Sequence, residues 1–333
     1  MAPRVVLYST GGTIASVGGS AGQATPRLGA GELIAALPGL GQVAELEAVT
    51  LRQVPSPELG LADLVELSRK AAEAVDAGAD GVVITQGTDT MEESAFVLDL
   101  LWEREAPLVV TGAMRTPEQA GADGPANLLA AVRVAASAAA RGLGCVVVMN
   151  DQIHAARFVR KAHTTNPGAF GSPACGPLGW VAEGRVRVVA RPPRLPALRL
   201  DQVPEEVPVA LVRAALGDDG RLLRALPGLG YRGVVVEATG GGHLPRSWVP
   251  LLEELGWTMP VVLASRTGAG ELLRRTYGFP GSETDLLARG LVPAGALDGL
   301  KARLLLMLVL ATGGGREEVA ETFRRMDPAG PET

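Results

Sequence analysis

The stretch Val82–Phe96, VVITQGTDTMEESAF, passes directly from a strand pattern to a helix pattern. Its first four residues are apolar or β-branched, which is typical of a strand covered on both faces in a parallel sheet. Two threonines, an aspartate and a glycine separate this run from the helix pattern that begins at Met91. Ligands bind beyond the carboxyl ends of strands in open α/β sheets. The turn at 86–90 is therefore either a helix cap or one wall of a binding site.

Short apolar runs alternate with helix-like stretches through the first half of the chain. Strands are predicted at Val5–Tyr8, Val82–Thr85, Leu108–Thr111 and Cys145–Met149. Helices are predicted at Leu61–Ala77, Met91–Trp102 and Pro125–Arg141. This alternation predicts an α/β fold whose larger N-terminal domain, residues 1–190, is a parallel sheet with flanking helices.

A proline-rich segment with little periodicity, residues 191–208, predicts an interdomain linker. Beyond it, strands are predicted at Val209–Val212, Val234–Glu237 and Val261–Ala264. Helices are predicted at Ser247–Leu255, Thr284–Arg289 and Leu297–Leu310. Residues 209–333 are therefore expected to form a second, smaller α/β domain.

The composition is that of an ordinary globular chain, with 333 residues, 47% apolar side chains and a net charge of −5. No basic run favours nucleic-acid binding. The apolar run Leu304–Thr312 is too short to span a bilayer. Only Cys145 and Cys175 are present, which fits a reducing compartment, and the N-terminus lacks the features of a secretory signal. We expect a cytoplasmic protein without membrane or nucleic-acid partners.

Other strand ends in the first half carry residues of the same kinds. The first strand runs into STGGTIAS at 9–16, and a later one runs into GAMR at 112–115. The two glycines of the first loop let backbone amides approach a ligand, with Thr13 exposed beside them. Their spacing is not that of a nucleotide-binding loop. The following SVGGSAGQATP is small and polar, which favours a mobile lid over a plain surface loop.

The turn at 86–90 has a structural alternative. Thr88 or Asp89 could be the N-cap of the following helix, with Glu92 or Glu93 completing a capping box. Capping does not require both hydroxyls and the carboxylate. It also leaves the matching hydroxyl loop around Thr13 unexplained.

The few lysines of this arginine-rich chain also carry information. Lys70 and Lys301 occur in helix patterns and are expected to be solvated surface residues. Lys161 lies in a loop with threonines and a histidine, where a lysine favours a role that needs a proton able to leave. The three histidines have no metal-site spacing, so we predict no metal and ordinary loop positions for His154, His163 and His243.

Taken together, these loops resemble the bacterial-type L-asparaginase family, whose signatures are TGGTIA near the start and HGTDTMEE further along. They stand here as TGGTIA at Thr10–Ala15 and QGTDTMEE at Gln86–Glu93. Further matches to the family pattern are GAMR at Gly112–Arg115, ADGP at Ala122–Pro125 and MND at Met149–Asp151. Lys161 also falls at the family's lysine position. The resemblance covers most of the first domain and the C-terminal domain in outline.

The resemblance implies a threonine amidohydrolase that converts L-asparagine to L-aspartate and ammonia without a cofactor. Thr13 would be the nucleophile that forms an acyl-enzyme. Lys161 would assist proton removal from Thr88, which then acts on water or on the amide. Asp89 would belong to this second group and would also hold the substrate's α-amino group.

The resemblance further implies a substrate-binding set around these catalytic residues. Ser56, in VPSPE, would help to hold the α-amino and α-carboxylate groups. Backbone amides near Thr88 and Ala113 would stabilise the oxyanion. Gly12 and Gly87 are the remaining members of the expected set.

The chain departs from the family pattern in two places. The lid segment has no tyrosine, although family members usually carry one there that is thought to polarise the nucleophile. Gln86 replaces a common histidine. The family also implies a homodimer or homotetramer with active sites at the subunit interface, completed by a C-terminal residue of a neighbouring subunit. Candidates for that residue are His243, Arg266 and Glu271.

Two alternatives remain open, and the sequence argues against a third. A related amidase could prefer glutamine. A catalytically weak amino-acid-binding protein of the same fold would fit the missing lid tyrosine. A subunit that supplies ammonia for tRNA-dependent amidation would carry an extra N-terminal domain, whereas the nucleophile motif here begins near Ser9.

Overall fold

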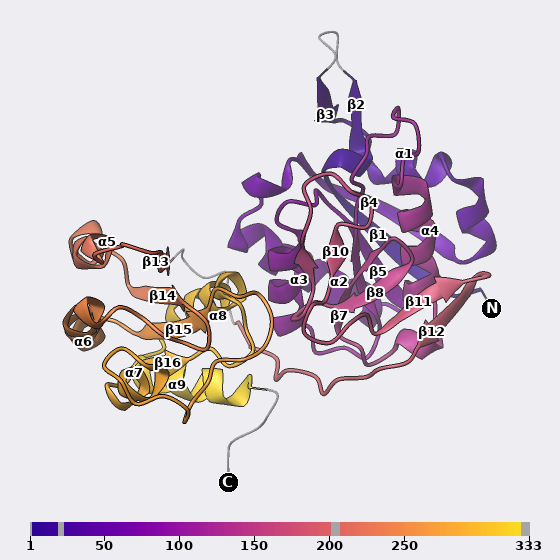
Figure 1. Cartoon of the computed structure of the whole chain (residues 1–333). Coiled ribbons are helices and arrows are strands. Elements are labelled where there is room, and N and C mark those ends of the chain that lie inside the picture. The colour runs from indigo at the N-terminus through magenta and orange to yellow at the C-terminus, as the bar shows by residue number, and fades with distance from the viewer. Residues whose placement is uncertain (1, 19–22, 201–206, 328–333) are drawn as a thin grey trace. The chain divides into compact units, whose positions relative to one another are not determined.

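The computed structural model describes residues 2–18, 23–200 and 207–327 of the chain (Figure 1). The chain separates into two compact units, Met1–Arg199 and Leu200–Thr333. Part of the predicted linker, residues 201–206, lies outside the described residues. The part before it is bonded to the N-terminal unit, because Leu198 N–H donates to the Leu100 carbonyl and Arg191 Nη1 donates to the Arg141 carbonyl.

The described part of the N-terminal unit is built on an eight-stranded sheet in the order β12-β11-β8-β7-β6-β5-β1-β4 (Figure 1). Its parallel strands are β4 (Glu45–Val54), β1 (Arg4–Gly11), β5 (Gly81–Thr85), β6 (Leu108–Thr111) and β7 (Cys145–Met149). The antiparallel strands are β8 (Gln152–Ala155), β11 (Gly179–Ala182) and β12 (Arg185–Val188). The predicted strands at β1, β5, β6 and β7 are confirmed.

Helices cover both faces of this sheet because successive strand residues point to opposite sides. Leu7 and Val83 enter a core with α1 (Ala30–Ala35) and α4 (Gly124–Ala135). The next residues, Tyr8 and Ile84, enter a second core with α2 (Leu61–Asp76) and α3 (Met91–Leu100). The predicted doubly covered parallel sheet is confirmed. The helix predicted to reach Arg141 ends earlier, at Ala135, and a separate 3₁₀ turn follows at Ala138–Ala140.

Two segments that the sequence analysis singled out have local structural roles. Asn150 and Asp151 have φ values of 51° and 59° and connect β7 to antiparallel β8. Positive φ at both central residues is what a tight two-residue hairpin turn requires. The lid segment begins and ends in short paired strands, β2 (Ser16–Gly18) and β3 (Ala24–Pro26), while residues 19–22 lie outside the described part.

The C-terminal unit has a parallel sheet of β13 (Val209–Arg213), β14 (Gly233–Ala238), β15 (Val261–Ser265) and β16 (Val292–Pro293). Its helices are α5 (Arg221–Ala225), α6 (Val249–Thr258), α7 (Glu283–Ala288), α8 (Gly299–Ala311) and α9 (Arg316–Arg325). The smaller α/β unit is thus confirmed. Lys301 was wrongly predicted as a surface residue, since it is 1% exposed and its Nζ lies 3.1 Å from Asp298 Oδ2. In the described ranges, no helix combines the length and apolar character needed to cross a membrane.

Candidate active site

Three loops at the carboxyl ends of β4, β1 and β5 meet through glycine backbones. A Cβ placed on Gly12 would lie 2.1 Å from the amide nitrogen of Gly87, and Gly12 has a φ of 80°. A Cβ placed on Gly87 would lie 2.9 Å from Ser56 Oγ. Only glycine permits such approach and such a φ. Thr13 and Thr88 each directly follow one of these contacting glycines, so the fold brings the two hydroxyl loops together.

Replacement of Gly12 by alanine should therefore separate the loops. The new methyl group would overlap the Gly87 backbone, so we expect a stability loss of roughly 3 kcal/mol or more and a large loss of ligand binding. Gly31→Ala is the matched control, because a Cβ there meets nothing within 4 Å and the residue lies in α1. Urea unfolding of both variants measures the difference, and wild-type stability in Gly12→Ala would refute the packing argument.

The loop after β6 is held by hydrogen bonds to residues at the start of α4. The Asp123 carboxylate accepts the N–H groups of Met114 and Arg115, both at 2.9 Å. Asn127 Nδ2 donates to the carbonyl of the loop's first residue at 3.0 Å. Ala113, between these anchors, is fully buried. The sequence motif ADGP therefore holds the predicted oxyanion loop in place, a role that sequence reasoning did not assign.

Lys161 joins the two polar side chains that follow β5. It lies in the short strand β9 (Arg160–Lys161), which pairs with β10 (Phe170–Gly171). Its Nζ donates to Thr88 Oγ1 at 2.9 Å and to Asp89 Oδ1 at 2.5 Å. The Lys161 backbone N–H donates to Glu92 Oε2 at 3.0 Å, which fixes the lysine from α3. The Lys161 side chain is 14% exposed, whereas Asp89 is 69% exposed.

The helix-cap alternative for Thr88 and Asp89 does not hold. The N-cap of α3 is Thr90, and no side chain caps it. Thr90 instead ties the β5 loop to Ser56, because Thr90 N–H donates to Ser56 Oγ at 3.3 Å and Thr90 Oγ1 donates to the Ser56 carbonyl at 3.0 Å. Ser56 is 2% exposed, and within the described ranges its own O–H donates to no protein acceptor, so it remains available for donation.

Thr13 opens a 3₁₀ turn, Thr13–Ala15, whose N-cap is Gly12. Its side chain is partly exposed, while Ile14 and Ala15 are buried in the core behind it. Within the described ranges, the Thr13 hydroxyl makes no hydrogen bond to protein. The structure therefore pairs Lys161 with the second threonine and leaves the first hydroxyl open to a ligand.

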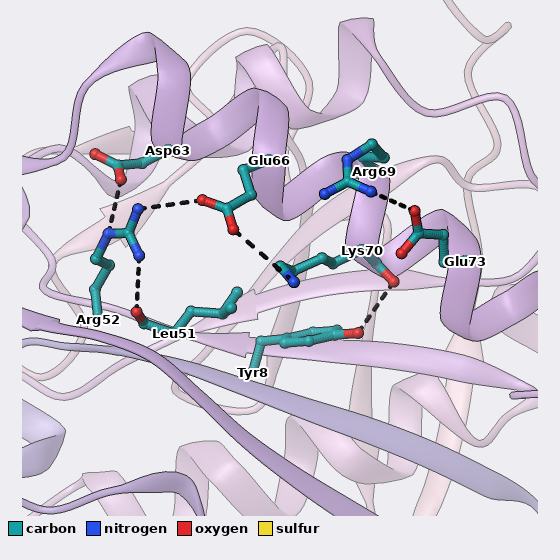
Figure 2. A network of polar contacts seen from close by, with 8 residues as sticks. All are labelled: Tyr8, Leu51, Arg52, Asp63, Glu66, Arg69, Lys70 and Glu73. Carbon is teal, nitrogen blue, oxygen red and sulfur yellow. Dashed lines mark hydrogen bonds and ion pairs between the residues drawn. The ribbon is translucent and has the colours of Figure 1, made fainter. Parts of the chain in front are cut away.

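Tyr8 does not replace the tyrosine that the lid lacks. Its hydroxyl donates to the Lys70 carbonyl in α2 at 3.0 Å, beside the ion pairs of Arg52 with Asp63 and Glu66 (Figure 2). Burial raises the pKa of this phenol. The Tyr8 hydroxyl is therefore already used in a hydrogen bond that holds α2 against the sheet.

The remaining sequence candidates lie in the C-terminal unit. His243 Nε2 lies 3.2 Å from Glu283 Oε2, a carboxylate that also accepts N–H groups of the residues at 276 and 277. Arg266 Nη1 donates to the Ala214 carbonyl. Across the described residues, no cluster of His, Cys, Asp or Glu is arranged to bind a metal.

His154 was wrongly predicted as a loop residue, since it lies in β8 and is 1% exposed. Burial lowers its pKa from 6.5 to about 4. As pH falls from 6.5 to about 4, the unfolded chain binds a proton here and the folded chain does not. Stability should therefore fall by about 1.4 kcal/mol per pH unit from this residue.

Unfolding of the wild type and His154→Gln across this pH range tests the expectation. The substitution should flatten the pH dependence. An unaltered slope in His154→Gln would show that other groups cause the acid destabilisation.

The chain is similar to known proteins over most of its length. Residues 4–194 match the family model for "Asparaginase, N-terminal", and residues 208–323 match "Glutaminase/Asparaginase C-terminal domain". A probable L-asparaginase of Deinococcus radiodurans is 39% identical, covering 96% of this chain and 97% of its own. An L-asparaginase of Bacillus licheniformis is 35% identical, covering 94% and 97%.

A solved structure of similar fold is the probable cytoplasmic L-asparaginase from Campylobacter jejuni. It is 31% identical, has a TM-score of 0.86, and the match covers 96% of this chain and 99% of the other. Both family models and these relatives, which match over nearly their whole length, show the family. The chain belongs to the asparaginase family.

Proposed function

We propose that this protein is an L-asparaginase that hydrolyses L-asparagine to L-aspartate and ammonia. The observation that carries the proposal is that Lys161 joins Thr88 and Asp89, which lie on a loop packed directly against the Thr13 loop. Family membership supports an amide hydrolase, and the cluster supplies groups that this chemistry needs.

In the proposed reaction, Thr13 Oγ1 attacks the side-chain amide carbon and forms an ester, while the hydroxyl proton of Thr13 is transferred to the amide nitrogen, which leaves as ammonia. Water then hydrolyses the ester, which releases L-aspartate and returns a proton to Thr13. Covalent catalysis divides a difficult hydrolysis into two easier steps. Lys161, once deprotonated, can take the proton of Thr88, which then acts on the incoming water or on the amide. Lysine suits this exchange, since its ammonium can lose a proton whereas a guanidinium cannot.

The developing oxyanion needs preorganised donors. Among the described residues, neither the Thr88 N–H nor the Ala113 N–H donates to a protein acceptor, so both remain free to bind a ligand oxygen. One donor of this kind contributes about 2.7–4 kcal/mol where mutagenesis has removed it. The anchoring of the Ala113 loop by Asp123 and Asn127 keeps one donor fixed.

The same loops offer groups for a zwitterionic amino acid. The exposed Asp89 carboxylate can hold the α-ammonium group, and the free O–H of Ser56 can donate to the α-carboxylate. Gly12 and Gly87 bring backbone close to the same space. No cofactor enters the proposal.

A second candidate function is motivated by the sequence of the lid. Without a lid tyrosine, the chain could bind an amino acid and turn it over only slowly. An assay of ammonia release from L-asparagine, L-glutamine and D-asparagine, with calorimetry of binding, separates the candidates. The proposal expects fastest release from L-asparagine. Stoichiometric binding of L-asparagine without ammonia would support the binding protein, and preference for L-glutamine would support the related amidase.

We also propose a cytoplasmic homodimer or homotetramer. The free thiols Cys145 and Cys175 support a reducing compartment. The assembly proposal comes from the resemblance, which implies that a neighbouring subunit completes each site. Light scattering of the purified chain tests it, and a monomer with full activity would refute a shared site.

A further inference from the structure

A hollow lies next to the cluster of Thr88, Asp89 and Lys161. Part of its lining has no role in the proposed mechanism. The hollow has a volume of about 570 Å³ and is lined by Asp89 together with residues 161–164. Lys161 and Asp89 are the cluster residues already described. His163 and Thr164 are the other polar side chains of the lining.

The His163 ring is held by its own loop. Its Nδ1 accepts the N–H groups of Thr165 at 3.1 Å and Asn166 at 3.0 Å. An imidazole nitrogen that accepts cannot carry the proton, so the neutral ring carries it on Nε2. The turn continues as Asn166 Oδ1 accepts the Gly168 N–H at 2.8 Å. The loop therefore presents one oriented N–H donor at the wall of the hollow.

The other polar groups of the site indicate which part of a substrate this donor would bind. Two hydrogen bonds of Lys161 Nζ already go to Thr88 and Asp89. Asp89 is an acceptor and can bind only the ammonium end of an amino acid. The α-carboxylate has two oxygens to satisfy, and Ser56 offers a single O–H. His163 adds a donor on the same wall that Asp89 lines.

We propose that His163 Nε2–H donates to the α-carboxylate of the substrate and selects for amino acids over simple amides. This inference rests on the proposed function and adds a specificity residue to it. A site built to hydrogen-bond a substrate group discriminates strongly against analogues that lack the group. Loss of one hydrogen bond to a charged group corresponds to about 10- to 100-fold in affinity.

The decisive variant is His163→Asn. An asparagine side chain can accept N–H groups two and three residues further on, as His163 Nδ1 does, so it keeps the turn but lacks the Nε2–H donor. His163→Ala removes both the acceptor that holds the turn and the Nε2–H donor. We expect both variants to raise KM for L-asparagine by about 10-fold or more, with a much smaller change in kcat.

The matched substrate is 3-aminopropanamide, which keeps the amine and the amide but has no α-carboxylate. Its kcat/KM should be the same for the wild type and His163→Asn. If His163→Asn restores the wild-type KM for L-asparagine while His163→Ala does not, the side chain only holds the turn and the proposal is wrong. Equal losses on both substrates would also overturn it.

Binding of L-aspartate, measured by calorimetry, separates this inference from the proposed reaction. L-Aspartate carries the same α-carboxylate and needs no turnover. The wild type should bind it at least about 10-fold more tightly than His163→Asn, whether or not ammonia is released. Equal binding by the two proteins would contradict the role of His163, and absence of ammonia from the wild type would contradict only the asparaginase proposal.

Discussion

Replacement of Thr13 by alanine should lower kcat for ammonia release from L-asparagine by a factor of about 10³ or more. The hydroxyl is the proposed nucleophile, and Thr88, whose Oγ1 accepts from Lys161 Nζ, has a separate proposed role. The core should not change, since Ile14 and Ala15 anchor the turn behind it. Ammonia release and circular dichroism measure the two effects.

Thr258→Ala is the matched control for this loss. Its hydroxyl donates to the Leu255 carbonyl at the end of α6, in the C-terminal unit. The same chemical change there should leave kcat near the wild-type value. A folded Thr13→Ala enzyme with near-normal ammonia release would remove Thr13 from the mechanism.

Replacement of Lys161 by methionine should lower kcat by a factor of about 10² to 10⁴, the range that general acid–base groups contribute. Thr88 would lose the only base proposed for it. The effect on stability should be small, because the partner carboxylate of Asp89 is mostly exposed and such ion pairs contribute little. A large kinetic loss with little change in unfolding is the expected signature.

Lys161→Arg separates the effect of the positive charge from that of proton transfer. Arginine keeps the positive charge near Asp89 but does not release a proton, so activity should remain low. Lys70→Met, in α2, is the control and should retain activity. Recovery of wild-type kcat in Lys161→Arg would mean that the charge alone is needed and that proton transfer through this residue is not.

The sequence predicted the centre of the N-terminal sheet better than its edges. Strands β5, β6 and β7 are buried at every residue, so their apolar runs stand out. β4 lies at the end of the sheet and alternates between exposed and half-buried residues, and it was not predicted. An edge strand has only one neighbour and carries many polar side chains, which removes the apolar signal.

The ambiguity of the turn after β5 also has a physical cause. Threonine and aspartate before a helix favour capping and ligand binding equally, since both use the same oxygen atoms. The choice depends on Lys161, which is 72 residues beyond Asp89 in the sequence and reaches it through β9. Only the resemblance to a family indicated this long-range pair, because spacing carries no information about it.

The most direct test of the central claim is peptide mapping by mass spectrometry after rapid acid quench of enzyme mixed with L-asparagine. The wild type and Thr88→Val should be compared, since the latter lacks the hydroxyl that Lys161 serves. The account predicts an aspartyl ester on Thr13. An aspartyl group on Thr88 with Thr13 unmodified would contradict it.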